Sequence, residues 1–485
     1  MNSSVPSEQD GKRRHLVILG GGLAGLWAGY RLQKHGFEVS ILEQEPTPGG
    51  LLETVEIDGF CFDLGPHIFL EEHLPHYTEL VGKEIRPVRG FYGVGFQGKE
   101  VRSPIQPMNL LKTLGVAESL PMVLSMLYAK LAKRPSSNGY SNVDEVIVAR
   151  FGEQISRNFF RDYIPKVTGL PAIEVSPDWF LERYRFYQEH NLWASMLGKA
   201  LRSVTARLGR KRKEDEGLKV FYPERGAQMI TDALVSKIEE RGGTVRTGVR
   251  METVERLSGQ IDVHYNAADG TRRREAGDIV ISTLPVTELM GMLNPAPPEE
   301  VLKAAQRLSY RRLAVFFIVV HRDFLTEKIQ IYFPESRYPF KRIYEPKNLD
   351  PTMGEKGKTG ICVEVCFGEA DGPFEEIREE MYRSVLEGLG HFFGLREDEV
   401  VCQQAREVPY AYAIYREGYR DELQTLASYL FPIDNLISYG RQGSFRYNHL
   451  VDRVIDAFSE TLQFIKTGKS KEEFLGTPSA KSPFF

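Results

Sequence analysis

The sequence feature that most constrains the fold is a glycine-rich turn between a short apolar run and a helical stretch. Residues 15–19 read His-Leu-Val-Ile-Leu, which favours a buried strand, and residues 20–25 read Gly-Gly-Gly-Leu-Ala-Gly. Residues 26–32 have helical periodicity, and residues 37–42 predict a second strand. Strand, glycine turn, helix and strand together predict a Rossmann-type β-α-β unit and an α/β fold.

The glycines of this turn have different expected roles. Gly20 permits the tight turn, Gly22 lets the backbone approach a diphosphate, and Gly25 lets helix and strand pack closely. The helix N-terminus favours the anion through its unpaired N–H groups and its dipole. Glu43, at the tip of the second strand, can accept hydrogen bonds from a ribose hydroxyl. The unit therefore predicts a dinucleotide site with contacts at Gly20, Gly22, Leu23, Ala24, Gly25 and Glu43.

Two further motifs narrow the choice of dinucleotide. Residues 48–52 read Pro-Gly-Gly-Leu-Leu, and residues 62–69 read Phe-Asp-Leu-Gly-Pro-His-Ile-Phe. With the glycine turn and the acidic strand tip, they resemble the FAD-dependent superfamily of amine oxidases, protoporphyrinogen oxidases, phytoene desaturases and UDP-galactopyranose mutases. No second unit of strand, glycine turn and helix is apparent in the sequence, so a separate NAD(P)H domain is not expected. The resemblance implies non-covalently bound FAD and further cofactor contacts at Gly49, Gly50, Leu51, Gly65, Pro66 and His67.

The resemblance also implies how the domains are organised. Residues 221–229, Phe-Tyr-Pro-Glu-Arg-Gly-Ala-Gln-Met, are similar to the family's return into the FAD domain, and residues 278–285 are similar to its strand that ends in STxP. We expect a discontinuous Rossmann-type FAD-binding domain interrupted by a mixed α+β substrate domain, with Val249 as a further FAD contact. The expected FAD-domain segments are 15–70, 220–295 and 431–485, and a disordered tail covers 1–14. The expected substrate-domain segments are 71–219, which is mainly helical in pattern, and 296–430, which contains strands such as 313–320 and 360–367.

Residues 440–447, Gly-Arg-Gln-Gly-Ser-Phe-Arg-Tyr, resemble the GRxGxxRY segment of the mutases and related oxidoreductases. The resemblance implies flavin contacts at Gly440 and Arg441 and a substrate or flavin contact at Tyr447. His449 stands where the mutases have an aspartate, so that role is not transferred. His67 is interpreted as a flavin contact or proton shuttle, with a structural turn histidine as the alternative. The predicted catalytic residues are His67, Arg441 and Tyr447.

A weaker similarity concerns the substrate. Residues 160–169 resemble the mutase segment YTxKxW, in which Tyr163 and Lys166 match and are predicted substrate contacts. The mutase tryptophan that stacks on uridine is replaced by Thr168. This replacement counts against a uridine nucleotide as substrate.

Composition limits the classes of partner. The chain has 485 residues, 42% of them hydrophobic, which fits two domains, and its net charge of -4 gives no case for nucleic-acid binding. The four cysteines have no paired CxxC spacing, so neither a metal centre nor a disulfide framework is expected. The polar residues 1–14 lack the apolar segment of a signal peptide. We therefore expect a cytoplasmic protein.

Two stretches bear on membrane contact. Residues 199–213 contain seven basic residues and no acidic one, and residues 120–133 are apolar with lysines at their end. These stretches indicate either peripheral contact with an anionic membrane or lipid-linked phosphate, or a solvated helix face followed by a loop. We favour the solvated face at this point, and the sequence leaves the oligomeric state open.

Three functions agree with these motifs. The first is an FAD-dependent oxidoreductase in which an organic substrate, small or lipid-linked, transfers a hydride to flavin N5. The second is a redox-neutral isomerase, similar to UDP-galactopyranose mutase, that uses reduced FAD on a sugar or lipid-linked sugar phosphate. The third, a flavin-binding protein without catalysis, is disfavoured by the motifs that face the flavin in the family. The substrate and the electron acceptor stay open.

Overall fold

A five-stranded parallel sheet organises the first large unit of the fold. The computed structural model describes residues 8–9, 12–82, 85–103, 105–132, 139–189, 218–447, 450–482 and 484–485. Strands from three distant parts of the sequence meet in this sheet, which confirms the predicted discontinuous Rossmann-type fold. In spatial order they are β11 (Thr244–Arg246), β4 (Glu38–Leu42), β3 (His15–Leu19), β15 (Ile279–Ser282) and β22 (Leu436–Ser438).

The two faces of this sheet are covered by different layers. Along β3, Leu16 and Ile18 pack with the helical layer, whereas Val17 and Leu19 pack into the core on the other side, as the alternation of side chains along a strand requires. The helical layer consists of α1 (Leu23–Gln33), α2 (Leu74–Val81), α10 (Gln228–Glu239) and α16 (Leu450–Thr467).

A four-stranded sheet covers the other face. Its order is β14 (Arg272–Gly277), β13 (Ile261–Asn266), β12 (Arg250–Arg256) and β16 (Leu293–Asn294). Its apolar side chains share one core with the helices α11 (Val286–Met292), α12 (Glu299–Arg307) and α14 (Tyr419–Leu430).

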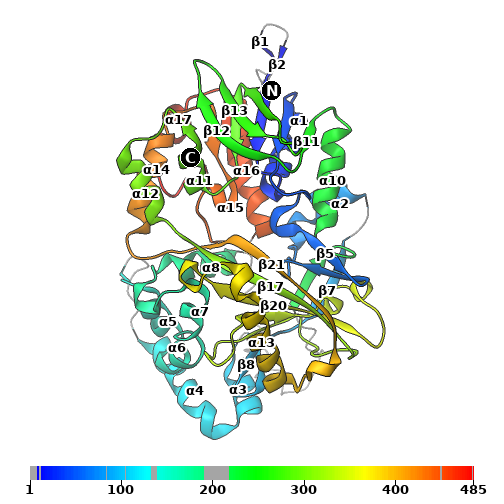
Figure 1. Cartoon of the computed structure of the whole chain (residues 1–485). Helices are drawn as coiled ribbons and strands as arrows, with labels where there is room; N and C mark the ends of the chain where they lie inside the picture. Colours follow the sequence, from blue (N-terminus) through cyan, green and yellow to red (C-terminus); the bar gives the residue numbers. More distant parts are fainter. Residues whose placement is uncertain are drawn as a thin grey trace, which may run out of the picture.

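A seven-stranded sheet forms the second large unit, below the parallel sheet in Figure 1. One face packs on the long helix α13 (Phe374–Phe393), and the other packs on residues of β6 (Phe60–Asp63), which pairs with β5 (Thr54–Ile57). Its strands, in spatial order, are β21 (Val400–Ala413), β17 (Tyr310–Val320), β20 (Thr359–Phe367), β19 (Arg342–Tyr344), β18 (Gln330–Tyr332), β8 (Tyr92–Phe96) and β9 (Lys99–Ser103).

A group of helices extends from this sheet. It consists of α3 (Pro107–Leu114), α4 (Val116–Leu131), α5 (Val143–Phe151), α6 (Glu153–Phe159), α7 (Tyr163–Thr168) and α8 (Asp178–Glu189). Two short helices near the C-terminus, α15 (Gly440–Gly443) and α17 (Lys471–Leu475), belong to the first unit. Among the described helices, none has the length and apolar character needed to cross a membrane.

The structure differs from the sequence-based expectation in two segments. Residues 71–219 were expected to be mainly helical, but β7 (Arg86–Gly90), β8 and β9 lie there, and β7 pairs with β10 (Leu218–Tyr222). β8 and β9 pair with each other, but β7 and β8 also have partners far along the chain, β10 and β18, and local periodicity does not reveal those distant pairings. Within residues 1–14, expected to be disordered, β1 (Glu8–Gln9) pairs with β2 (Lys12–Arg13). The basic stretch 199–213 lies outside the described residues.

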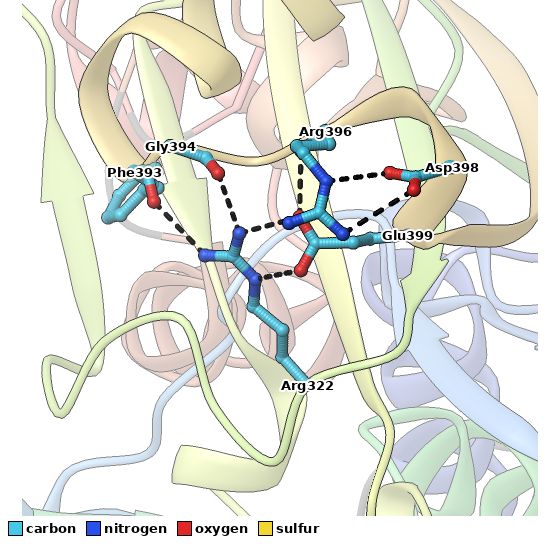
Figure 2. A network of polar contacts seen from close by, with 6 residues as sticks. All are labelled: Arg322, Phe393, Gly394, Arg396, Asp398 and Glu399. Atoms are coloured by element: carbon cyan, nitrogen blue, oxygen red, sulfur yellow. Dashed lines mark hydrogen bonds and ion pairs between the residues drawn. The ribbon is translucent and has the colours of Figure 1, made fainter.

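A network of charged groups fixes the end of α13 against the large sheet, as Figure 2 shows. Arg322 donates to the carbonyl oxygens of Phe393 and Gly394 at 3.0 and 2.7 Å. It also donates to both carboxylate oxygens of Glu399 at 2.7 Å. This arginine, which follows β17, therefore holds the helix end beside the start of β21.

Candidate active site

At positions 20 and 25, contacts within the protein leave room only for glycine. Gly20 has a φ of +100°, which L side chains rarely adopt, and a Cβ there would overlap the Thr283 hydroxyl. A Cβ on Gly25 would overlap the carbonyl oxygen of Gly20. These two glycines therefore shape the turn from β3 into α1.

Gly22 differs, because the protein leaves the space beside it open. A Cβ there would meet one atom within 4 Å, the Cα of Gly50 at 3.9 Å, and the φ of -72° suits any residue. Gly22 is the N-cap of α1, whose first turn carries no acidic side chain. The N–H groups of this turn and the open space fit the diphosphate of a dinucleotide.

The second glycine pair lies against this turn. The Gly49 N–H donates to the carbonyl oxygen of Gly21 at 2.9 Å, and Gly49 and Gly50 have positive φ values of 137° and 57°. Leu51 follows in the same turn and packs beside the core of the large sheet. The predicted contacts at residues 49–51 and at residues 20–25 thus come together, although 23 residues or more separate them in sequence.

Glu43 lies at the tip of β4, beside the same turn. Its Oε2 accepts from the Gly21 N–H at 2.5 Å and its Oε1 accepts from the Glu45 N–H at 2.8 Å. Burial raises the pKa of Glu43, and these backbone N–H groups oppose the rise. Val249 is buried and its N–H donates to the carbonyl oxygen of Glu43 at 2.9 Å. The ribose contact of Glu43 and the FAD contact of Val249 stay predictions.

His67 lies in the loop after β6, together with Gly65 and Pro66. One ring nitrogen hydrogen-bonds the backbone of Leu51, whereas Nε2 is buried and has no partner among the described residues. Burial, and then the nearby Arg342 guanidinium, lower the pKa of His67 to about 4. The ring is therefore neutral near pH 7, and Nε2 is a buried polar atom that a bound group could satisfy.

A buried cluster of charges lies next to His67, and the sequence motifs did not predict it. Glu364 on β20 is fully buried, its Oε2 lies 2.6 Å from Lys341 Nζ, and its Oε1 accepts from Arg342 Nε at 2.9 Å. The Tyr412 hydroxyl on β21 contacts Lys341 Nζ. Burial opposes ionisation of Glu364, but Arg342 and Lys341 hold its pKa below the usual value. Glu364 is therefore an ionised carboxylate between two cations.

One sequence signal could have revealed this cluster. Glu364 is the one charged residue within residues 359–367, a run that otherwise reads as a buried apolar strand. A carboxylate at such a position is costly unless it is paired with a cation. Its presence in the strand therefore indicated a buried ion pair, although its partners, Arg342 on β19 and Lys341 just before it, could not be identified from the sequence.

The C-terminal motif connects the glycine turn to the charged cluster. Gly440 has a φ of +88°, and a Cβ there would lie 2.9 Å from the Cβ of Ala24 at the start of α1. Arg441 Nη2 donates to the carbonyl oxygen of Ala411 on β21 at 2.7 Å. The Arg441 guanidinium lies 5.6 Å from the ring centre of Tyr412 and 5.5 Å from that of Tyr447. His67, Arg441 and Tyr447 thus surround one cluster.

Tyr447 also has an aromatic partner from the helical group. Its ring stacks on Trp179 of α8 at a centroid distance of 5.8 Å and an angle of 12°, and Tyr412 meets the same ring edge-on at 5.0 Å. The Tyr447 N–H donates to the Tyr415 hydroxyl oxygen at 2.8 Å. These contacts hold the phenol ring in one orientation beside Arg441.

The weakly predicted substrate contacts lie on α7. Lys166 Nζ donates to the carbonyl oxygens of Phe333 and Glu335 at 2.7 Å and of Phe340 at 3.3 Å, and burial lowers its pKa to about 8. These bonds engage all three N–H donors, so they do not favour a substrate contact for Lys166, which stays a prediction. The Tyr163 ring lies 6.2 Å from the ring of Tyr332, whose hydroxyl accepts a hydrogen bond from Gln330. Gln330 in turn accepts from Arg342 of the charged cluster at 3.4 Å.

A separate histidine–carboxylate group lies on β12 and β13. Glu255, Asp262 and His264 place one ligand atom each within 4.8 Å of one another. His264 Nε2 lies 3.0 Å from Glu255 Oε2, and Asp262 Oδ2 accepts from Arg274 at 2.8 Å. These pairings account for the group without an ion, and it lies outside the cluster around Glu364.

The fold brings together the glycine turn, the Gly49-Gly50 segment and the C-terminal motif, and this arrangement fits the dinucleotide that the motifs predict. Residues 23–453 match the family described as flavin containing amine oxidoreductase, and the chain belongs to this family. Membership of this family makes the chain a flavin-binding one, and its cofactor is FAD, as the sequence motifs predicted.

Similar proteins come from several branches of this superfamily. A 4,4'-diaponeurosporene oxygenase of Staphylococcus aureus (strain Mu50 / ATCC 700699) is 24% identical over 260 residues, or 50% of each chain. The chain therefore spans about half the length of the curated relatives it matches. A crystal structure of reduced UDP-galactopyranose mutase matches with a TM-score of 0.75 at 21% identity, covering 96% of this chain and 98% of the other. A redesigned putrescine oxidase matches with a TM-score of 0.62 at 15% identity, covering 94% and 99%. These structures show the shared fold.

Proposed function

We propose that the protein is an FAD-dependent oxidoreductase whose small organic substrate gives up a hydride beside His67, Arg441 and Tyr447. The observation that carries this proposal is the excess of positive charge around Glu364. Among the described residues, the two cations Lys341 and Arg342 flank the Glu364 carboxylate. Arg441 lies against the Tyr412 ring beside them, and His67 is neutral. Such preorganised charge stabilises negative charge that develops during a reaction.

The residues of the cluster have distinct roles in this proposal. FAD, when bound, supplies the hydride acceptor. Arg441 and Arg342 stabilise the developing negative charge, and Glu364 keeps Arg342 of β19 and the preceding Lys341 in place. The neutral His67 ring, with one nitrogen engaged by Leu51, holds or accepts a proton at Nε2.

A second candidate function is a redox-neutral isomerisation that uses the same cofactor in its reduced form. The Gly65-Pro66-His67 loop and the 440–447 motif, which meet at one cluster, favour it. Thr168 counts against a uridine nucleotide substrate, because its hydroxyl donates to the Ile164 carbonyl oxygen at 2.8 Å within its own helix and provides no aromatic surface. The oxidoreductase is therefore preferred.

Anaerobic addition of candidate organic substrates to the FAD-loaded protein separates the two functions. Loss of the oxidised-flavin absorbance upon mixing, with formation of oxidised product, supports the oxidoreductase. Product formation only after chemical reduction of the protein, with no net change in redox state, supports the isomerase instead.

A further inference from the structure

Helix α4 presents a continuous apolar stripe to the solvent. Among the described residues, ten large apolar side chains are exposed, and seven of them lie on α3 and α4. Six of the seven belong to α4, with exposed fractions from 48% for Leu120 to 86% for Leu131. The six are Val116, Leu120, Leu124, Leu127, Tyr128 and Leu131, and Met108 of α3 adds a seventh.

The six side chains lie on one side of the helix. At about 100° per residue, positions 116, 127, 120, 131, 124 and 128 follow one another around an arc of roughly 120°. The buried residues Ser119, Met122 and Ala129 lie on the opposite side, where α4 packs on the protein. The stripe is therefore not core, and an apolar surface of this size on one helix marks an interaction site.

The charges near the stripe indicate the kind of partner. Residues 107–132 contain the basic Lys112 and Lys130, both exposed, and a single acidic residue, Glu118. By helical spacing, Lys130 borders the stripe, whereas Glu118 lies on the far side of the helix. Tyr128, at the other border, is of a residue type enriched at membrane–water interfaces. An apolar face bordered by lysine suits an anionic lipid surface.

The position of the helix agrees with this partner. In Figure 1, α3 and α4 form the end of the molecule farthest from the parallel sheet, so this end can meet a surface without obstruction. The 16 residues of α4 extend about 24 Å, less than the roughly 30 Å of a bilayer core. With its other side packed on the protein, α4 would lie in the plane of the interface.

We propose that the stripe on α4 docks the protein peripherally on an anionic bilayer, with the six apolar side chains inserted at the level of the headgroups. This replaces the solvated-face interpretation for the part of residues 120–133 that lies on α4. The inference does not depend on the reaction proposed above, because the stripe shares no residue with the charged cluster.

The test is co-sedimentation of the FAD-loaded protein with vesicles of phosphatidylcholine alone and of phosphatidylcholine mixed with phosphatidylglycerol. We expect binding to the anionic vesicles, weaker binding to the neutral ones, and weakening by salt. Leu124→Ser combined with Leu127→Ser should lower the partition coefficient roughly tenfold or more, because two inserted leucines are lost. Lys130→Gln should lower it less, and only on anionic vesicles.

A matched control uses exposed apolar residues elsewhere. Leu257→Ser combined with Phe324→Ser removes two side chains that are also exposed, with fractions of 43% and 53%, and should leave vesicle binding unchanged. Bound flavin per chain and gel-filtration volume are recorded for every variant. Failure of the wild type to bind vesicles, or equal binding by the Leu124/Leu127 variant, would overturn the proposal. The proposal would also be overturned if the wild type is a dimer, the Leu124/Leu127 variant is a monomer, and neither binds vesicles.

Discussion

Substitution of Gly22 by alanine should weaken FAD binding without unfolding the protein. The added Cβ meets one protein atom within 4 Å, the Gly50 Cα at 3.9 Å, and needs no change in φ. The free energy of unfolding should therefore change by less than about 1 kcal/mol, the scale of an N-cap substitution. The methyl group does occupy the space in which the diphosphate is expected to approach the N–H groups of α1.

The expected loss of affinity follows from those N–H groups. A hydrogen bond to a charged group contributes about 1.5–3 kcal/mol, so losing two of them costs about 3–6 kcal/mol. Since every 1.4 kcal/mol is about tenfold, the dissociation constant of FAD should rise roughly 100-fold or more. Gly22→Val, with a larger side chain in the same space, should bind no measurable FAD.

Fluorescence titration of apoprotein with FAD, paired with chemical denaturation, measures both quantities. Gly25→Ala is the contrasting variant, because its Cβ would overlap the Gly20 carbonyl oxygen and should destabilise the fold itself. If Gly22→Ala keeps wild-type affinity for FAD at wild-type stability, residues 20–25 are not the diphosphate site and the cofactor placement is wrong.

Three further predictions concern charged and titratable side chains. Burial lowers the pKa of His67 in the folded state to about 4, whereas the unfolded ring titrates near 6.5. Acidification from pH 6.5 to 4 should therefore favour the unfolded state by at most about 3 kcal/mol. In urea unfolding, His67→Asn should lose that part of the pH dependence. Glu364→Gln leaves Lys341 and Arg342 without their buried counter-charge and should lower the free energy of unfolding in denaturant by about 3–5 kcal/mol. The control Glu53→Gln breaks a more exposed ion pair with Arg406 and should lower it by at most about 1 kcal/mol. Equal effects would show that the Glu364 pairs are not buried in this way. Arg322→Met should lower the melting temperature more than Arg396→Met does. Arg322 binds both the end of α13 and Glu399, whereas Arg396 binds Asp398 in its own exposed turn (Figure 2). The reverse order would show that the network does not hold the helix end.

The parts of the fold that could be predicted are those whose partners are close in sequence. Residues 15–42 hold strand, turn, helix and strand together, so periodicity and glycine spacing suffice. The strand at 313–320 was also predictable, because a buried strand between two neighbours is apolar throughout. By contrast, β8 lies beside β18, more than 200 residues later, and no local pattern indicates this pairing.

The candidate site divides in the same way. Gly22, Gly49 and Gly440 belong to motifs that a family resemblance can recognise. Lys341 and Tyr412 belong to no motif, and they reach the site because β19, β20 and β21 place them there by the register of the large sheet. The candidate site therefore depends both on local turns and on strand pairing, and only the local turns could be predicted from the sequence.

We propose that the substrate reacts at the cluster of His67, Arg441, Tyr447 and Glu364. The most direct test is the rate at which a substrate reduces the bound flavin in anaerobic stopped-flow. The wild type is compared with Arg441→Ala, Arg441→Lys and the control Arg446→Ala. Arg446 serves as the control because its guanidinium donates to the carbonyl oxygens of Lys481 and Ser482. Loss of one charge-stabilising contact costs about 2–4 kcal/mol, so Arg441→Ala should keep its FAD but reduce it roughly 30- to 1000-fold more slowly. Arg441→Lys should recover part of the rate, since lysine lacks the planar fork of donors. Reduction of the Arg441→Ala flavin at the wild-type rate would contradict the account.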